Sequence, residues 1–170
     1  SLPNPGSQGS LSFNKNIVID TKGPQVVSVG SSTENGSYRN GAIIKIVVDF
    51  DENVYVLGSP SILLETGSSK VSAIYSSGSA TSTLVFDYTV QTEHNTNDLD
   101  YAGNNALKLN GGSIKDIVAI DANPILPIVN TLKAMKDIRI DNIPPQITQS
   151  SINNNGNIPV IYNSKIIYTV

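Results

Sequence analysis

Apolar and polar residues alternate in short runs through the middle of the chain. Two runs, residues 83–91 and 42–50, show a period of two, which is typical of strands with one buried face. The residues that share the apolar faces are Leu84, Phe86, Tyr88 and Val90 in the first run and Ile44, Ile46, Val48 and Phe50 in the second. Both runs are therefore predicted to be half-buried strands that face one core.

Shorter runs of the same type follow between turn-forming residues. They predict strands at residues 25–29, 61–65, 71–75, 107–109, 113–115 and 136–140. The triplet Asn110-Gly111-Gly112 tolerates positive φ and predicts a hairpin between residues 107–109 and 113–115. No segment keeps a period of 3.6 over three turns. The pattern predicts an all-β protein, an antiparallel β-sandwich of about seven to nine strands.

One segment recurs within the chain. Residues 17–26 read Ile-x-Ile-Asp-x-x-x-Pro-Gln-apolar, and residues 138–147 read the same way about 121 residues later. We interpret residues 1–20 as the tail of a preceding repeat, 21–141 as a complete repeat, and 142–170 as the first strands of the next repeat. Neighbouring repeats of the same chain are then the first partners to expect.

The composition excludes several classes of protein. The chain has no Cys, no Trp, one His, 15% charged residues and a net charge of -3, so disulfides, thiol catalysis, Cys-based zinc sites and nucleic-acid binding are not expected. No apolar run approaches the roughly 18–20 residues that span a bilayer, and residues 1–6 do not resemble a signal peptide. His94 lies in a polar stretch and is predicted to be a solvated loop residue rather than a general base. The chain is not expected to be an enzyme.

Carboxylates cluster in the predicted loops. Asp98 and Asp100 are two residues apart and point the same way in extended backbone, where a cation between them would relieve their repulsion. If the loops converge at one pole, Asp20 and Glu52 join them in a calcium site. Asx-turn formation, with each side chain bonding its own backbone, is the alternative. Asp116 and Asp121 suggest a second, weaker site.

Four segments together resemble the bacterial immunoglobulin-like tandem repeats of large surface and secreted proteins. They are the Asp-Thr-x-x-Pro junction at residues 20–24, the strand end at 45–54, the segment Asn-Asp-Leu-Asp-Tyr at 97–101, and Leu-x-Leu-Asn-Gly-Gly-x-Ile-x-Asp at 107–116. The resemblance implies an Ig-like sandwich, extracellular display at a bacterial cell surface, and use as an adhesin stalk, fibre or surface-layer module.

The same resemblance implies calcium at the junctions between repeats, as in cadherin-like arrays. Carried over to this chain, the ligands would be Asp20 and Asp141 at the junctions, with Glu52, Asp98 and Asp100 nearby. One segment departs from the family pattern: an apolar stretch follows Asp116 where the family usually has Ala-Ala-Gly-Asn.

The sequence therefore predicts a non-catalytic structural module, stiffened by calcium. The alternative is an adhesin module that binds a carbohydrate, protein or surface receptor, for which Tyr38, Tyr55, Tyr75 and Tyr101 are candidate ring platforms. Self-association into a fibre or lattice by strand exchange is a further expectation, because the flanking strands lack their own domains.

Overall fold

The computed structural model describes residues 2–15, 18–67, 69–146, 160–162 and 165–167. Their regular structure is almost entirely β, and the two helices, α1 (Leu11–Asn14) and α2 (Leu132–Met135), have four residues each. The predicted all-β, antiparallel sandwich class is confirmed. Neither helix has the length or the apolar character to cross a membrane.

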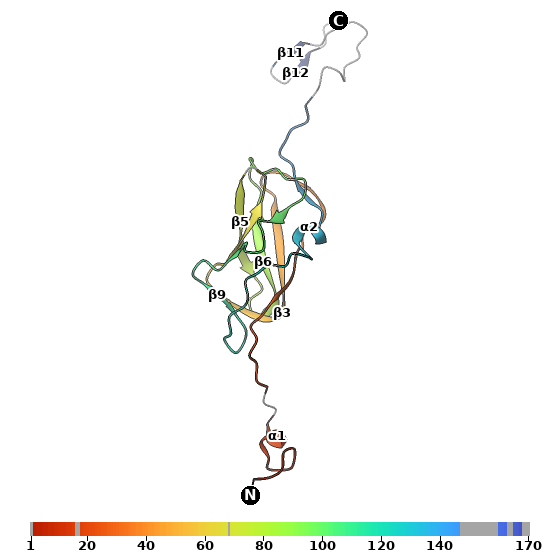
Figure 1. Ribbon diagram of the computed structural model, residues 1–170. Coiled ribbons are helices and arrows are strands. Elements are labelled where there is room, and N and C mark those ends of the chain that lie inside the picture. Colours follow the sequence, from red (N-terminus) through yellow and green to blue (C-terminus); the bar gives the residue numbers. More distant parts are fainter. Residues whose placement is uncertain (1, 16–17, 68, 147–159, 163–164, 168–170) are drawn as a thin grey trace.

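One antiparallel sheet forms most of the body and curls on itself (Figure 1). Its hydrogen-bonded path runs β1 (Val26–Ser31), β3 (Ile43–Leu57), β6 (Thr81–Thr89), β5 (Lys70–Ser77), β4 (Ser61–Glu65) and β7 (Asp100–Tyr101). Strand β3 is longer than its alternating run predicts, because its register shifts between Asp49 and Val54 and the strand continues to a second set of partners. This bend places Glu52 at one end of the sandwich.

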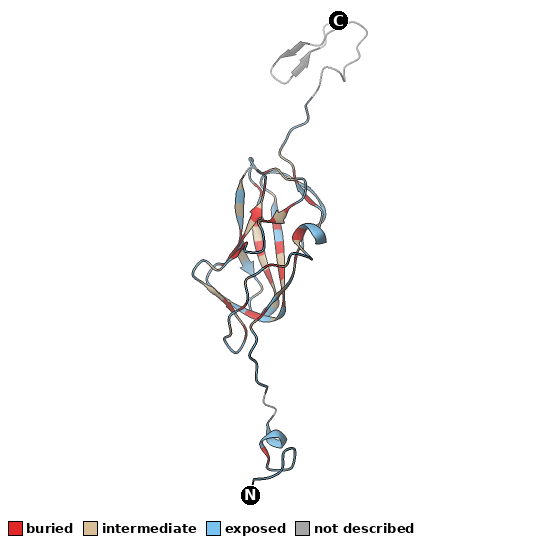
Figure 2. Cartoon of the chain, viewed as in Figure 1, coloured by how far each residue is buried: buried red, intermediate tan, exposed pale blue. Residues whose placement is uncertain are grey.

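The core lies on the inner face of this sheet (Figure 2). Every residue predicted for the apolar faces of the two long runs is at most 4% exposed. Residues after position 98 add further buried side chains to this core, among them Leu99, Ile114, Leu126, Leu132 and Ile138. Alternation therefore predicted the inner face of the sheet correctly, since a period of two puts every second side chain on one face.

The predicted hairpin around Asn110 is wrong in its pairing. The turn itself forms, with φ of 53° at Asn110 and 79° at Gly111. However, β8 (Leu107–Lys108) pairs with β4, whereas β9 (Ser113–Lys115) pairs with the far end of β3. The turn therefore connects two separate parts of the curled sheet. The residues of the turn are the same in either case, so they cannot distinguish such a connection from a hairpin.

A small parallel pair completes the body. Strand β10 (Ile138–Ile140) pairs with β2 (Gly36–Tyr38), a strand that is not among those predicted from the sequence pattern. Beyond residue 146 the structure describes only a pair of short antiparallel strands, β11 (Val160–Tyr162) and β12 (Lys165–Ile167). The division of the chain into three repeat segments stays a prediction.

Candidate metal centre

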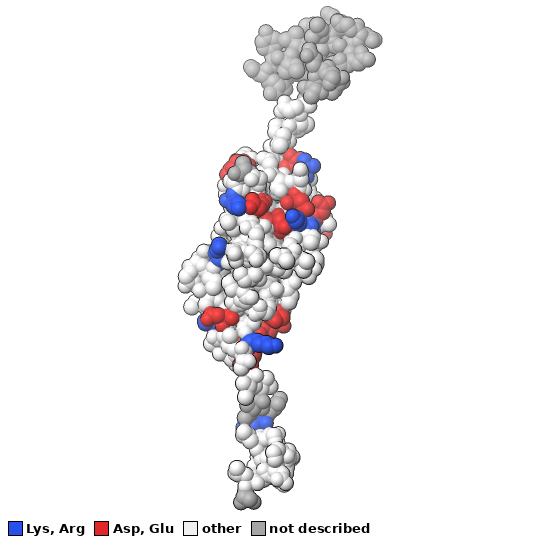
Figure 3. Space-filling model, viewed as in Figure 1, with Lys and Arg blue, Asp and Glu red and all other residues white. Residues whose placement is uncertain are grey.

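Acidic side chains gather at the two ends of the sandwich, and the middle of the visible face carries few charges (Figure 3). We call the end where residues 20–25 lead into β1 the N-terminal pole, and the end where residues 141–146 leave β10 the C-terminal pole. The two poles lie at opposite ends of the body (Figure 1).

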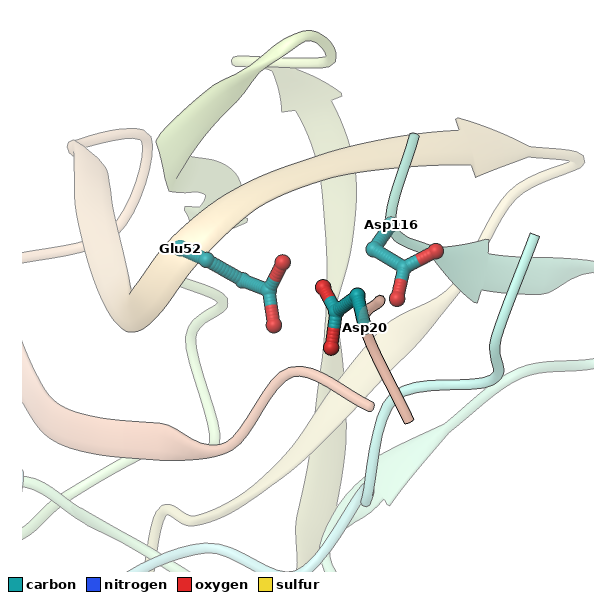
Figure 4. A group of neighbouring side chains, drawn as sticks. All are labelled: Asp20, Glu52 and Asp116. Carbon is teal, nitrogen blue, oxygen red and sulfur yellow. The ribbon is translucent and has the colours of Figure 1, made fainter. Parts of the chain in front are cut away.

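Three carboxylates converge at the N-terminal pole. Asp20 comes from the segment before β1, Glu52 from the bend of β3, and Asp116 from the residue after β9, and their side chains face one another (Figure 4). Each offers an oxygen, and these three oxygens lie within 4.8 Å of one another. Asp20 is exposed, Glu52 is intermediate and Asp116 is buried.

Asp116 is held rigidly in this cluster. One carboxylate oxygen, Oδ1, accepts hydrogen bonds from the backbone N–H of Val118 at 2.8 Å and of Ile120 at 2.9 Å. The other oxygen, Oδ2, is buried and has no hydrogen-bond partner among the described residues. The side chain is only 3% exposed. An unpartnered buried carboxylate oxygen is costly, so a cation or water bound at Oδ2 would stabilise the fold.

The electrostatics of the cluster affect Glu52 most. Partial burial, followed by the nearby carboxylates of Asp20, Asp116 and Asp51, raises the pKa of Glu52 above its usual value. Like charges this close disfavour joint ionisation, and a bound cation removes that penalty. The donor set consists only of oxygen, which fits a hard divalent cation such as calcium, with water or backbone carbonyls completing its shell.

The segment that carries Asp20 is fixed against the sandwich just after that residue. The backbone N–H of Gln25 donates to Asp51 Oδ1 at 2.7 Å, and Asn123 N–H donates to the Pro24 carbonyl at 2.9 Å. At Gly23, a Cβ atom would lie 2.1 Å from the Asp121 carbonyl oxygen, so only glycine fits there. The position of Asp20 is thus restricted by close contacts three to five residues further along the chain.

Asp98 and Asp100 do not join this cluster, which corrects the expected single site. They precede and begin β7, near α2, where Asp100 Oδ1 accepts from Tyr101 N–H at 2.9 Å and Oδ2 lies 3.7 Å from Lys133 Nζ. Asp98 is exposed. Partial desolvation by neighbouring atoms, then repulsion from Asp137 and Asp100, raises the pKa of Asp98, and attraction by Lys133 offsets part of this rise. The loop convergence assumed from the sequence fails because β7 pairs with β4 near the C-terminal pole.

Asp141 lies at the C-terminal pole, also apart from the cluster. Its Oδ1 accepts from Ile143 N–H at 3.1 Å, and its Oδ2 lies 3.1 Å from Arg139 Nη2. The second site suggested for Asp116 and Asp121 is not formed either. Asp121 Oδ1 lies 2.6 Å from Lys115 Nζ, whereas Asp116 faces Asp20 and Glu52. Sequence reasoning ranked Asp116 too low: its place after a predicted strand was a signal, but the apolar residues that follow it obscured that signal.

His94 is buried rather than solvated. Its backbone N–H donates to the Gln91 carbonyl, and this turn folds the ring back under the end of β6. There Nδ1 lies 2.8 Å from the Tyr88 hydroxyl and accepts from Gln91 N–H at 3.1 Å. The ring is 2% exposed, so it contributes to packing at the C-terminal pole.

The candidate tyrosine platforms are mostly engaged within the fold. Tyr38 donates its hydroxyl to the Glu34 carbonyl, Tyr75 packs edge-on against Phe86, and Tyr101 is buried. Only Tyr55 among the four has an exposed ring, at 39%. Comparisons with protein-family models, curated proteins and solved structures returned no match to this chain.

Proposed function

We propose that this chain is a non-catalytic structural module of an extracellular bacterial tandem array, of the adhesin-stalk, fibre or surface-layer kind. We further propose that calcium at the N-terminal pole, held by Asp20, Glu52 and Asp116, ties the unit to the segment before it. One observation carries the proposal: a residue of the incoming segment and two residues of the sandwich each bring a carboxylate oxygen within 4.8 Å of the others, and one of these residues, Asp116, has a buried oxygen without a hydrogen-bond partner among the described residues.

The chemistry of the three residues supports calcium in particular. Calcium takes six to eight oxygen ligands in flexible geometry, and three carboxylates from separate segments provide part of that shell. The cation would supply positive charge that offsets the repulsion among the carboxylates. Because Asp20 belongs to the incoming segment, binding would restrict the hinge at this pole.

The C-terminal pole supports a stiff module in a different way. Asn142 fastens the outgoing segment through four hydrogen bonds: its Nδ2 donates to the carbonyls of Gln91 and His94, its N–H donates to Asn95 Oδ1, and its Oδ1 accepts from Asn40 N–H. Two prolines follow at positions 144 and 145, which further limit bending. Both ends of the unit thus hold their flanking segments close to the body.

A distance measurement across the N-terminal pole tests this function. The chain has no Cys, so Ser12→Cys and Ser72→Cys, both at exposed positions, allow two spin labels to be placed without background. We expect calcium to narrow the distance distribution between the labels measured by pulsed electron paramagnetic resonance, relative to chelator.

Two variants complete the design. Glu52→Gln should abolish the narrowing, and Asp98→Asn, a charge-matched control outside the cluster, should keep it. A distribution that is equally broad with calcium and with chelator would overturn the proposal. Equal responses of the two variants would show that the cluster is not the binding site.

A further inference from the structure

We propose that residues 9–20 are the closing segment of a preceding sandwich unit, equivalent to the segment 130–141 that closes the unit described here. The partner that fits their apolar side chains is then a sandwich of this same kind, immediately before this unit in the chain. This inference rests on the proposed array function and names the partner of the incoming segment.

The segment 130–141 is an integral part of the present sandwich. Leu132, Ile138 and Ile140 are each at most 2% exposed. The backbone is fixed as well, since the Asn130 carbonyl accepts from Val29 N–H at 3.1 Å and the Ile138 carbonyl accepts from Leu99 N–H at 2.8 Å. The segment therefore fills a groove between β1, β2 and the approach to β7.

The N-terminal segment repeats the local structure of 130–141 step by step. Gly9 and Asn130 both have positive φ, 88° and 52°. The side chains of the next residues, Ser10 and Thr131, each cap a four-residue helix by accepting from the N–H three positions on. Each helix is followed by a lysine, Lys15 or Lys136, whose backbone N–H donates at 2.9 Å to the carbonyl of the first helical residue.

The correspondence continues to the acidic residues that follow. Asp20 Oδ1 accepts from the N–H of Lys22 at 3.1 Å, and Asp141 Oδ1 accepts from the N–H of Ile143 at 3.1 Å. Both aspartates directly follow the motif Ile-x-Ile. The local geometry thus agrees with the sequence repeat at the positive-φ residue, the short helix and the aspartate turn. Residues 16 and 17 lie outside the described residues, and residues 18–20 form no strand, whereas Ile138–Ile140 form β10.

The two segments have the same residue types at the positions that are buried in 130–141. The three positions buried in 130–141 carry identical residues in the N-terminal segment, namely Leu11, Ile17 and Ile19. Positions that are exposed in 130–141 differ, for example Ala134 against Phe13 and Arg139 against Val18. This is the pattern expected if both segments fill the same kind of groove, because packing constrains only the inward side chains.

In the part of the chain that the structure describes, the apolar side chains of the N-terminal segment are largely exposed. Leu11 is 68% exposed and Ile19 is 83% exposed, whereas their counterparts Leu132 and Ile140 are 0% and 2% exposed. Burying a Leu or Ile side chain stabilises a protein by about 1.5–3 kcal/mol, so these exposed side chains favour packing against a partner. Because Asp20 follows Ile19 directly and lies in the metal cluster of this unit, the partner belongs at the N-terminal pole, joined without a spacer.

A fusion of this chain to part of itself tests the proposal. Residues 24–129 are placed immediately before residue 9 of the full chain, so that the added unit lacks its own closing segment and has only residues 9–20 to complete it. In chelator, we expect both units of this fusion to be folded. Its unfolding enthalpy should be close to that of a reference fusion in which residues 24–140 precede residue 20, and both copies of β1 should show slow amide exchange.

The control is the same fusion with Ile17→Asp and Ile19→Asp. It should lose protection in the added unit alone, while the second unit, closed by its own residues 130–141, stays folded as an internal reference. An unprotected added unit in the unsubstituted fusion would overturn the proposal, and so would equal protection in the double variant. Because all measurements are made in chelator, failure here is distinct from failure of the calcium proposal.

Discussion

The substitution Asp116→Asn separates the two roles of the buried carboxylate. Asparagine keeps one oxygen to accept the N–H groups of Val118 and Ile120, and it replaces the unpartnered Oδ2 with an amide that can donate to Asp20 or Glu52. Without calcium, the variant should therefore be at least as stable as the wild type. With calcium, it should lose the stabilisation that the third carboxylate provides.

The size of the effect follows from linkage. At a calcium concentration one hundred times Kd, binding adds about 2.7 kcal/mol to the free energy of unfolding. For a unit of this size, about 1 kcal/mol moves Tm by roughly 4 °C, so the wild type should gain about 10 °C. Asp116→Ala, by contrast, removes both charge-assisted hydrogen bonds, and it should cost about 3 kcal/mol even in chelator.

Differential scanning calorimetry of the three proteins, each with calcium and with chelator, measures these differences. The reasoning fails if Asp116→Asn keeps the calcium shift of the wild type, because the buried oxygen would then not be a ligand. It also fails if Asp116→Asn is as unstable in chelator as Asp116→Ala, since the backbone hydrogen bonds would then need the full charge.

Three further expectations follow from the same structure. Ile138→Ala should lower the free energy of unfolding by about 2–4 kcal/mol in urea melts, because its side chain is fully buried, whereas the exposed neighbour Arg139→Ala should change it by less than about 0.5 kcal/mol. Because the pKa of Glu52 is raised, its ionisation destabilises the calcium-free fold. Lowering the pH from 7 towards 4.5 in chelator should therefore raise Tm more for the wild type than for Glu52→Gln, and parallel curves of Tm against pH for the two proteins would contradict this. Gly112→Ala should be strongly destabilising by thermal melt because its Cβ would lie 2.1 Å from a carbonyl oxygen of β3, whereas Gly30→Ala, with open space around it, should be tolerated; similar losses at both positions would refute the steric argument.

The strands of the inner sheet were predictable because their side chains alternate along the chain. The runs that contain Ile44 and Phe86 needed no tertiary information, since a half-buried strand imposes its period on the sequence. Strand β2 was not predictable in this way. It has three residues, with Gly36 at its start, and it exists because β10 pairs with it from about one hundred residues away.

The candidate metal centre was predicted in part. Asp20 and Glu52 were expected to meet, and they do. Asp98 and Asp100 were grouped with them because all four follow or precede strands, but sequence gives no measure of which end of a sandwich a loop occupies. Strand direction and pairing in the curled sheet decide that, and they bring Asp116 to the cluster instead.

The sequence by itself determined the fold class, the inward faces of the long strands and the recurrence of Ile-x-Ile-Asp, because each depends on local periodicity or direct comparison of residues. Only the tertiary structure decided which carboxylates share a pole, that His94 is buried, and that the strands flanking Asn110 pair with different partners. These features depend on contacts between residues far apart in the chain, and such contacts leave no regular period in the sequence from which they can be inferred.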